Sequence, residues 1–202
     1  MIKNVVFDFG QVLVRFEPAY IVAQHTSDPE IAKTLLDVVF DLSYWNRLDA
    51  GEVTDDEAIV HFRSQLPPEL RELGEQVFRS WIDHIPPLPR MWELVADLKA
   101  RGVPLFLLSN ISVHFVERAG EFSVLSLFDK CVFSGPCRMA KPDPQIFRHL
   151  LSVCDVKPEE TLFIDDSPKN IAGAESVGIH GYLFDGDPER LTAYLDTLFP
   201  RK

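Results

Sequence analysis

Acidic residues follow two short apolar runs in this sequence. Asp8 comes directly after the run at residues 5–7, and the pair Asp165-Asp166 comes directly after residues 161–164. Short apolar runs bounded by turn residues are typical of buried strands in a parallel sheet, and ligands bind outside the carboxyl ends of such strands. Two adjacent carboxylates with a third from another strand suit Mg²⁺, which prefers oxygen ligands and substrate phosphate. The three acids are therefore candidate metal ligands.

Two further polar groups occupy comparable positions. Ser109 and Asn110 follow the apolar run at 103–108, and Lys141 stands just before a predicted helix start. Each alone has a structural explanation, since a serine can be a loop hydroxyl and a lysine a solvated side chain. The carboxyl ends of parallel strands lie on one edge of a sheet, so residues far apart in the sequence meet there. The joint occurrence of these groups favours one shared site.

The composition narrows the possible functions. The chain has 202 residues, of which 46% are hydrophobic and 11% aromatic, enough for a sizeable core in one domain or in one domain with a large insert. Its net charge is −11 and it has no basic run, which disfavours binding to nucleic acid or to an anionic membrane. An anionic substrate would need a metal ion or a focused lysine or arginine.

The cysteines and the ends of the apolar runs bear on the compartment. The three cysteines (Cys131, Cys137 and Cys154) are odd in number and lack metal-ligand spacing, which favours reduced thiols in the cytosol. No apolar run approaches the roughly 18 residues of a membrane span, and the first strand begins too close to Met1 for a signal peptide. We therefore expect a cytoplasmic protein; the oligomeric state is not indicated.

The chain contains two regions with different sequence patterns. Residues 15–87 show helical signals, such as the start at Ser27-Asp28-Pro29 and the capping box at residues 54–57. From about residue 88, apolar strands alternate with helices, which predicts a parallel sheet covered on both faces. The prediction is a Rossmann-like α/β core formed by residues 1–14 and 88–202, with residues 15–87 as an inserted all-helical module.

Four stretches resemble the motifs of the haloacid dehalogenase superfamily: FDFGQVL with Asp8, FLLSN with Ser109, KPDPQIF from Lys141, and FIDDSPKNIAGA with Asp165-Asp166. The resemblance covers both segments of the core and implies the fold of that superfamily. The helical module is similar to its C1 cap, because the stretch between the second and third motifs is too short for the other cap position. The D-x-G-x-V first motif and the phrase at residues 49–54 are similar to the bacterial α-D-glucose-1-phosphate phosphatase branch, and also to the phosphatase-like N-terminal domains of bifunctional epoxide hydrolases.

The resemblance implies a mechanism. Asp8 would attack a phosphate monoester and form an aspartyl-phosphate. Asp8, the main-chain carbonyl of Gly10 and the pair Asp165-Asp166 would hold Mg²⁺, with Asp166 a direct ligand and Asp165 direct or through water. The expected function is a Mg²⁺-dependent phosphatase acting on a small soluble phosphorylated metabolite, for which a sugar phosphate is one candidate.

Other residues are assigned to binding. Lys141 would contact both the nucleophile and the phosphate, and Ser109 would bind a phosphoryl oxygen. Asn110 and Gly10 are expected beside the phosphate. Specificity is expected in the cap, where Trp45 and Arg47 are candidate substrate contacts.

One position departs from the family pattern. Most phosphatases of the superfamily carry a second aspartate two residues after the nucleophile, which acts as general acid and base, and here that residue is Gly10. General acid–base help is typically worth ~10²–10⁴-fold in rate. Asp49, Glu52, Arg47 or His114 could replace it, and the sequence does not select among them.

Two alternative functions remain open at this point. A dehalogenase would use the same aspartate nucleophile on carbon, but a metal-free displacement has no use for the Asp165-Asp166 pair. A regulatory relative that binds phosphate without turnover would retain the same motifs. Hydrolysis of p-nitrophenyl phosphate with and without Mg²⁺ separates the three functions.

Overall fold

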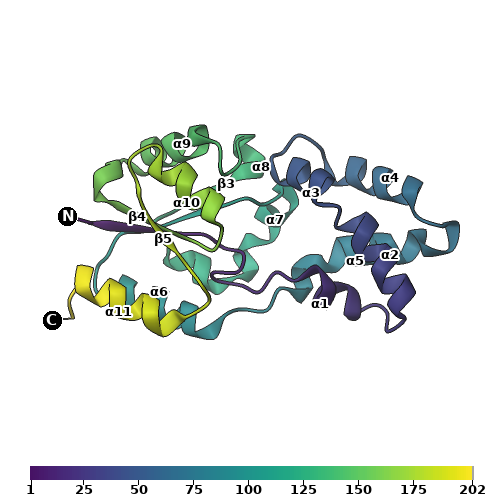
Figure 1. Ribbon diagram of the computed structural model, residues 1–202, viewed down its shortest axis with the longest axis horizontal. Helices are drawn as coiled ribbons and strands as arrows, with labels where there is room; N and C mark the ends of the chain where they lie inside the picture. Colours follow the sequence, from purple (N-terminus) through teal and green to yellow (C-terminus); the bar gives the residue numbers. More distant parts are fainter. Residues whose placement is uncertain (202) are drawn as a thin grey trace.

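Five parallel strands form the central sheet of the computed structural model, which describes residues 1–201 (Figure 1). The strands are β1 (Asn4–Phe7), β2 (Leu105–Ser109), β3 (Lys130–Phe133), β4 (Thr161–Asp165) and β5 (His180–Leu183). Their order across the sheet is β3-β2-β1-β4-β5, so β1 is central and pairs with β2 and β4. The α/β fold class expected from the alternating elements is confirmed.

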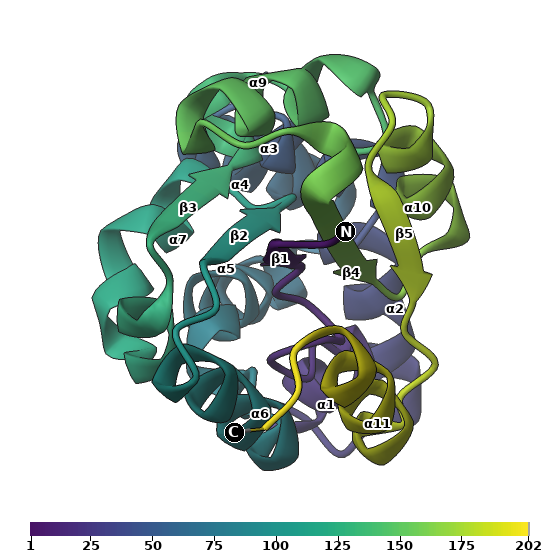
Figure 2. The same ribbon diagram turned by 90° about the vertical axis from the view of Figure 1, so that its left-hand side faces the viewer.

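Helices cover both faces of the sheet (Figure 2). On one face, Val6, Leu108 and Phe163 belong to a core that includes the buried side chains of α9 (Pro144–Cys154) and α10 (Pro168–Glu175). On the other face, the alternate residues of the same strands pack with α6 (Pro89–Ala100) and α11 (Pro188–Leu198). Successive side chains of a strand point to opposite faces, so burial on both sides explains why the strands are apolar throughout.

The segment after β1 contains only helices among its regular elements. They are α1 (Pro18–Ala23), α2 (Pro29–Val39), α3 (Leu42–Asp49), α4 (Asp55–Gln65), the 3₁₀ helix η1 (Pro68–Leu70), α5 (Arg71–Ser80) and the 3₁₀ helix η2 (Trp81–His84). Two expected caps are present: Asp28 accepts from the N–H groups of residues 30 and 31, and Thr54 forms a capping box with Glu57. Figure 1 shows this helical segment at the end of the molecule away from both termini.

The chain enters and leaves the helical segment along two adjacent strands of backbone. Val14 forms an antiparallel bridge with Pro87. The N–H of Arg15 donates to the Pro86 carbonyl at 2.8 Å, and the N–H of Leu88 donates to the Leu13 carbonyl at 2.9 Å. These two paired linkers place the helical segment next to the carboxyl ends of the β-strands.

Short elements complete the core: α7 (Val113–Arg118), α8 (Ser134–Cys137), and the 3₁₀ helices η3 (Ala119–Glu121), η4 (Ser123–Leu127) and η5 (Pro158–Glu160). Gly102 follows α6 with φ +78°, the left-handed conformation expected of a glycine after a helix. The three cysteines are free thiols. Within residues 1–201, none of the helices combines the length and the apolar character needed to cross a bilayer.

Candidate active site

Lys141 lies between two carboxylates from neighbouring strands. Its Nζ is 2.7 Å from Asp8 Oδ1 at the end of β1 and 2.7 Å from Asp165 Oδ2 at the end of β4. The ammonium also donates to the Leu108 carbonyl at 3.1 Å, and its side chain is 1% exposed. A single buried lysine neutralises at most one of the two carboxylates, so the group retains net negative charge.

Asp165 is held by four hydrogen bonds. Its Oδ1 accepts from the backbone N–H of Ser167 at 2.8 Å, and Asn170 Nδ2 lies 3.0 Å from each carboxylate oxygen. Lys141 supplies the remaining bond. Asp165 is fully buried, whereas Asp166 is exposed and borders the pocket described below. The more accessible carboxylate is therefore that of Asp166.

The donor set at this edge of the sheet fits a divalent cation. Carboxylate oxygens of Asp8, Asp165 and Asp166 all lie within 4.8 Å of one another. Three acids face one lysine here, and all the donors are hard oxygen atoms of the kind that Mg²⁺ prefers. The excess of negative charge is what a bound cation would compensate.

The electrostatics of the group reflect this crowding. Burial, together with the charge of Asp165, raises the pKa of Asp8 to about 7 against the opposing effect of Lys141. Burial and then the Asp165 charge raise the pKa of Asp166. For Lys141, burial lowers the pKa, but the two neighbouring carboxylates outweigh it, so the lysine stays charged. A cation here would favour the ionised carboxylates.

Ser109 and Asn110 have different surroundings at the end of β2. Ser109 is 2% exposed and borders the same pocket as Asp8. The Asn110 side chain pairs with the backbone of Lys141 in both directions, donating to its carbonyl at 2.8 Å and accepting from its N–H at 2.8 Å. Asn110 therefore fixes the segment that carries Lys141, a role that the sequence pattern does not reveal.

A cavity of about 210 Å³ contains these groups. The core and the helical segment both contribute to its wall. Gly10 also borders it, and a Cβ built there would meet no atom within 4 Å. The residues that line the cavity are Asp8, Phe9, Gly10, Gln11, Val14, Phe16, Trp45, Asp49, Trp81, Ile85, Ser109, Asn110, Ile111 and Asp166.

The helical segment contributes two of the residues singled out from the sequence, Trp45 and Asp49, both on α3. Arg47 is not among the lining residues. Its Nε lies 3.2 Å from Glu52 Oε2, its guanidinium lies 5.2 Å from the centroid of the Tyr44 ring, and its side chain is 51% exposed. Of the two cap acids considered from the sequence, Asp49 and Glu52, only Asp49 lines the cavity.

His114, another candidate, also lies outside this cavity. Its ring nitrogen is 3.9 Å from Asp55 and 3.7 Å from Glu117, on a separate hollow between α4 and α7. Among the candidates for the missing acid, the structure therefore brings Asp49 alone into the wall that it shares with Asp8.

Contacts with the core hold Asp49 in place. The Ser134 hydroxyl, at the start of α8, donates to the Asp49 carbonyl. Gly51, with φ +68°, lies so close to Gly135 that a Cβ would approach the Gly135 carbonyl oxygen to 2.2 Å. Burial, and next the charge of Asp8, raise the pKa of Asp49 well above its usual value. A half-buried, protonated carboxyl group can donate a proton.

Several residues of the site have no distinguishing signal in the sequence. Phe16, Trp81 and Ile85 line the cavity, yet each reads as an ordinary core residue of a linker or a helix. Asn170 is part of the fourth motif, and its fixed spacing of five residues from Asp165 could have indicated their contact. The aromatic residues could not have been found without the path of the chain.

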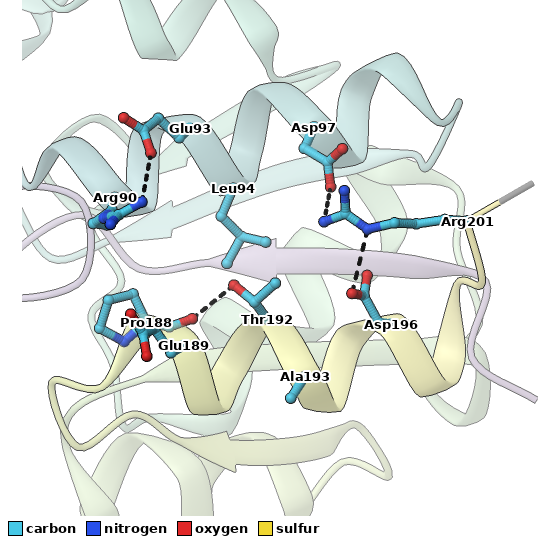
Figure 3. Close-up of a pocket in the computed structure, with 10 residues that line it drawn as sticks. All are labelled: Arg90, Glu93, Leu94, Asp97, Pro188, Glu189, Thr192, Ala193, Asp196 and Arg201. Carbon is cyan, nitrogen blue, oxygen red and sulfur yellow. Dashed lines mark hydrogen bonds and ion pairs between the residues drawn. The ribbon is translucent and has the colours of Figure 1, made fainter.

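A larger hollow, of about 480 Å³, lies between α6 and α11 (Figure 3). Both arginines that line it are paired with acids of the same hollow: Arg90 with Glu93, and Arg201 with Asp97 and Asp196. It has no buried lysine between carboxylates. The chemistry of this molecule therefore lies in the smaller cavity.

Comparisons with known proteins agree with this geometry. Residues 2–178 match the profile of the haloacid dehalogenase-like hydrolases. A D-ribitol-5-phosphate phosphatase of Bacteroides thetaiotaomicron is 30% identical over 193 residues, covering 90% of this chain and 91% of that protein. A sesquiterpene phosphatase of Aspergillus oryzae is 27% identical over 180 residues, covering 89% of this chain and 88% of that protein.

Solved structures of a haloacid dehalogenase family enzyme of Bacteroides thetaiotaomicron have the same fold. One, an aspartate-to-alanine variant with magnesium and inorganic phosphate, is 22% identical with a TM-score of 0.73, covering 95% of this chain and 99% of that one. Another, a magnesium complex, is 26% identical with a TM-score of 0.61, covering 90% of this chain and 92% of that one.

Proposed function

The chain belongs to the haloacid dehalogenase-like hydrolase family and is a phosphatase of that family, and we propose that it hydrolyses a small phosphomonoester through an aspartyl-phosphate on Asp8. The observation that carries this proposal is the buried Lys141 between Asp8 and Asp165, with Asp166 beside them. A nucleophilic carboxylate, a fixed cation and a cluster of oxygen donors are what phosphoryl transfer needs.

Mg²⁺ is the proposed cofactor. Asp8, Asp166 and the main-chain carbonyl of Gly10 would hold it, and Asp165 would bind it directly or through water. The four hydrogen bonds that Asp165 already makes favour the water-mediated position. A bound Mg²⁺ neutralises charge that otherwise keeps an anionic ester away from a carboxylate. The 26%-identical enzyme of Bacteroides thetaiotaomicron is a magnesium complex, which supports this choice.

In the first step, a carboxylate oxygen of Asp8 attacks phosphorus while the bond from phosphorus to the ester oxygen breaks. Lys141 holds Asp8 in place through Oδ1 and contacts the phosphoryl group, and Ser109 donates to a phosphoryl oxygen. The departing alkoxide takes the proton of Asp49, which assumes the role that Gly10 lacks. The products are an alcohol and the aspartyl-phosphate.

In the second step, water attacks the phosphorus of the aspartyl-phosphate. The carboxylate of Asp49 takes a proton from that water, and the bond from phosphorus to the Asp8 oxygen breaks. Inorganic phosphate leaves, Asp8 is regenerated as a carboxylate, and Asp49 is protonated again. One residue thus serves as acid and then as base, as microscopic reversibility favours.

The mechanism gives each part of the chain a role. We assign residues 1–14 and 88–202 to the catalytic core and residues 15–87 to a C1 cap that covers the site. Gly10 and Asn110 border the phosphate, and Trp45 contacts the alcohol. Arg47 would have to leave its pair with Glu52 before it could reach a substrate.

The likeness to the α-D-glucose-1-phosphate phosphatase branch is a proposal at the level of subfamily. It rests on the glycine of the first motif and on the phrase at residues 49–54. A sugar phosphate is accordingly one candidate substrate. One of the relatives named above is a D-ribitol-5-phosphate phosphatase and the other a sesquiterpene phosphatase, so the family likeness alone does not choose between esters of polar and of apolar alcohols.

Hydrolysis of p-nitrophenyl phosphate tests the proposal, because its good leaving group needs little acid assistance. Activity should require Mg²⁺ and should be abolished by EDTA and by Asp8→Asn, whose amide is a poor nucleophile. Metal-independent release of halide from a 2-chloro acid would instead indicate a dehalogenase. Phosphate binding without turnover of any ester would indicate a regulatory protein.

A further inference from the structure

We propose that the alcohol half of the substrate is uncharged and predominantly apolar, and that the part of it inside the cavity is about the size of a six-membered ring. This inference rests on the proposed phosphatase function and specifies the substrate class of the same site, favouring an apolar alcohol over the sugar that the subfamily likeness offers as a candidate. It is carried by three aromatic residues that line the cavity, Phe16, Trp45 and Trp81, which we call the aromatic wall.

Three separate elements supply the aromatic wall. Phe16 lies in the linker after β1, Trp45 on α3 and Trp81 at the start of η2. The ring centroid of Phe16 is 5.7 Å from that of Trp45 and 5.7 Å from that of Trp81, and the two indole rings are 5.8 Å apart. Mutual contact fixes the rings, so they form a rigid surface rather than mobile side chains.

The wall differs from the aromatic packing behind it. Phe40 stacks on Trp45 with centroids 4.9 Å apart, but it does not line the cavity. Phe16 is only partly buried and does line it. The aromatic cluster thus has an inner part that packs the cap and an outer part that faces the space beside Asp8.

Few polar groups remain to bind a polar alcohol. Gln11 Oε1 already accepts from the N–H of Phe16 at 3.2 Å, and the Asn110 amide is engaged with the backbone of Lys141. In the described part of the chain, the lining residues include no arginine, lysine or histidine. The other polar lining residues, Asp8, Asp49, Ser109 and Asp166, serve the reaction or the metal, which leaves the Gln11 Nε2 amide as a side-chain donor for the alcohol. An alcohol with several hydroxyl groups, or with a carboxylate, would therefore lose more water than these groups can replace, which is unfavourable.

The volume of the cavity indicates how much of the alcohol can be enclosed beside the phosphate. Its volume is about 210 Å³, and it must hold the phosphate as well as the alcohol. A protein cavity of about 150 Å³ is enough to bind benzene. The remaining space suits a short branched chain or a single ring, and a larger alcohol would extend towards the adjoining hollow that Gln11 and Asp166 also border.

The matched pair cyclohexyl phosphate and myo-inositol 1-phosphate tests the inference. Both are esters of a six-membered carbon ring, and only the second carries hydroxyl groups on its other carbons. We expect kcat/KM to be at least about tenfold higher for cyclohexyl phosphate, the order of discrimination that an apolar pocket achieves. p-Nitrophenyl phosphate serves as the measure of phosphatase activity itself.

A pair of variants ties the preference to the aromatic wall. Phe16→Gln should lower kcat/KM for cyclohexyl phosphate about tenfold more than it lowers kcat/KM for myo-inositol 1-phosphate. Phe40→Leu, in the same aromatic cluster but outside the cavity, should leave the ratio of the two substrates as it is. Thermal unfolding of each variant checks that the fold is retained, and the wild-type ratio does not depend on either variant.

Two results would overturn the inference. Hydrolysis of p-nitrophenyl phosphate together with equal or greater kcat/KM for myo-inositol 1-phosphate would overturn the apolar substrate class and leave the phosphatase function standing. Failure to hydrolyse any of the esters in the presence of Mg²⁺ would overturn the phosphatase function and the inference with it.

Discussion

Trp45 and Asp49 lie one turn apart on α3, and both line the cavity that contains Asp8. Residues four apart on a helix share one face, so the helix presents an apolar ring and a carboxyl group to the same space. Arg47, between them in the sequence, points to the surface and pairs with Glu52. The orientation of α3 therefore selects which residues of the cap can take part in the reaction.

Replacing Asp49 with asparagine should remove the proton donor and leave the cavity intact. For an alkyl phosphate, whose leaving group is poorly acidic, we expect kcat to fall about 10²–10³-fold, within the usual range for general acid–base catalysis. For p-nitrophenyl phosphate the loss should be much smaller. Glu52→Gln, which changes an acid outside the cavity, is the control. Equal losses on the two esters would contradict a role in leaving-group protonation.

The pH dependence of the same variant gives a second measurement. The pKa of Asp49 is raised, mainly by burial, so its protonated form persists to higher pH than that of an ordinary aspartic acid. The alkyl-ester rate of the wild type should decline as pH rises through this pKa, because the acid form is lost. Asp49→Asn lacks this group, so the ratio of wild-type to variant rates should fall towards one with increasing pH. A constant ratio would exclude Asp49 as the acid.

Installing an aspartate at Gly10 should supply an alternative acid. A Cβ at Gly10 meets nothing within 4 Å, and its φ lies outside the left-handed region, so the backbone accepts a side chain. We expect Gly10→Asp to restore much of the alkyl-ester activity lost in Asp49→Asn, with a weaker dependence on leaving-group pKa. Gly10→Asn, of the same shape without a transferable proton, should not restore it. Rescue by both variants would point to a steric effect.

The two acids of the fourth motif should differ in their effects. Asp165→Asn leaves Lys141 paired with Asp8 but puts an amide nitrogen among four hydrogen bonds that need acceptor oxygens, which should cost about 1–3 kcal/mol of stability. Asp166→Asn changes an exposed residue, so we expect stability within about 0.5 kcal/mol of wild type but a higher Mg²⁺ concentration for half-maximal activity. Urea unfolding without metal and Mg²⁺ titration of activity measure the two effects. The reverse pattern would exchange the assigned roles.

Gly173→Ala should destabilise the protein through the Lys141 segment. A Cβ at Gly173 would lie 2.5 Å from the Pro142 carbonyl oxygen and 2.9 Å from the Phe147 ring. Moving α10 away should cost about 1–3 kcal/mol and lower activity, since the loop carries Lys141. Gly120→Ala, where nothing lies within 4 Å, is the matched control. If the two variants had the same unfolding midpoint, the loop would accommodate the added Cβ without loss of stability.

Much of the site was predictable because it depends on local rules. Apolar runs ending in Asp8, Ser109 and Asp165 follow from the pattern of a buried parallel sheet, whose carboxyl ends share one edge. The structure places these residues on three adjacent strands, β2, β1 and β4, in that arrangement. The capping box at Thr54 is equally local, since a helix start needs a side-chain acceptor within three residues.

The sequence pattern does not predict contacts between segments that are distant along the chain. Asn110 belongs to a predicted motif, yet its partner is the backbone of Lys141, and no periodicity encodes a bond between two loops. Phe16 and Trp81 read as core aromatics, because a sequence does not distinguish a ring that packs inside a cap from one that faces a cavity.

The replacement for the missing acid shows most clearly which features follow from local sequence patterns and which depend on contacts between distant segments. The sequence establishes that residue 10, a glycine, has no side-chain acid, and it offers Asp49, Glu52, Arg47 and His114 as replacements without choosing among them. The choice depends on how α3 docks on the core, where the Ser134 hydroxyl and the close approach of Gly51 to Gly135 fix it. Docking is decided by the packing of whole surfaces, and so only the tertiary structure places Asp49 in the wall of the cavity that it shares with Asp8.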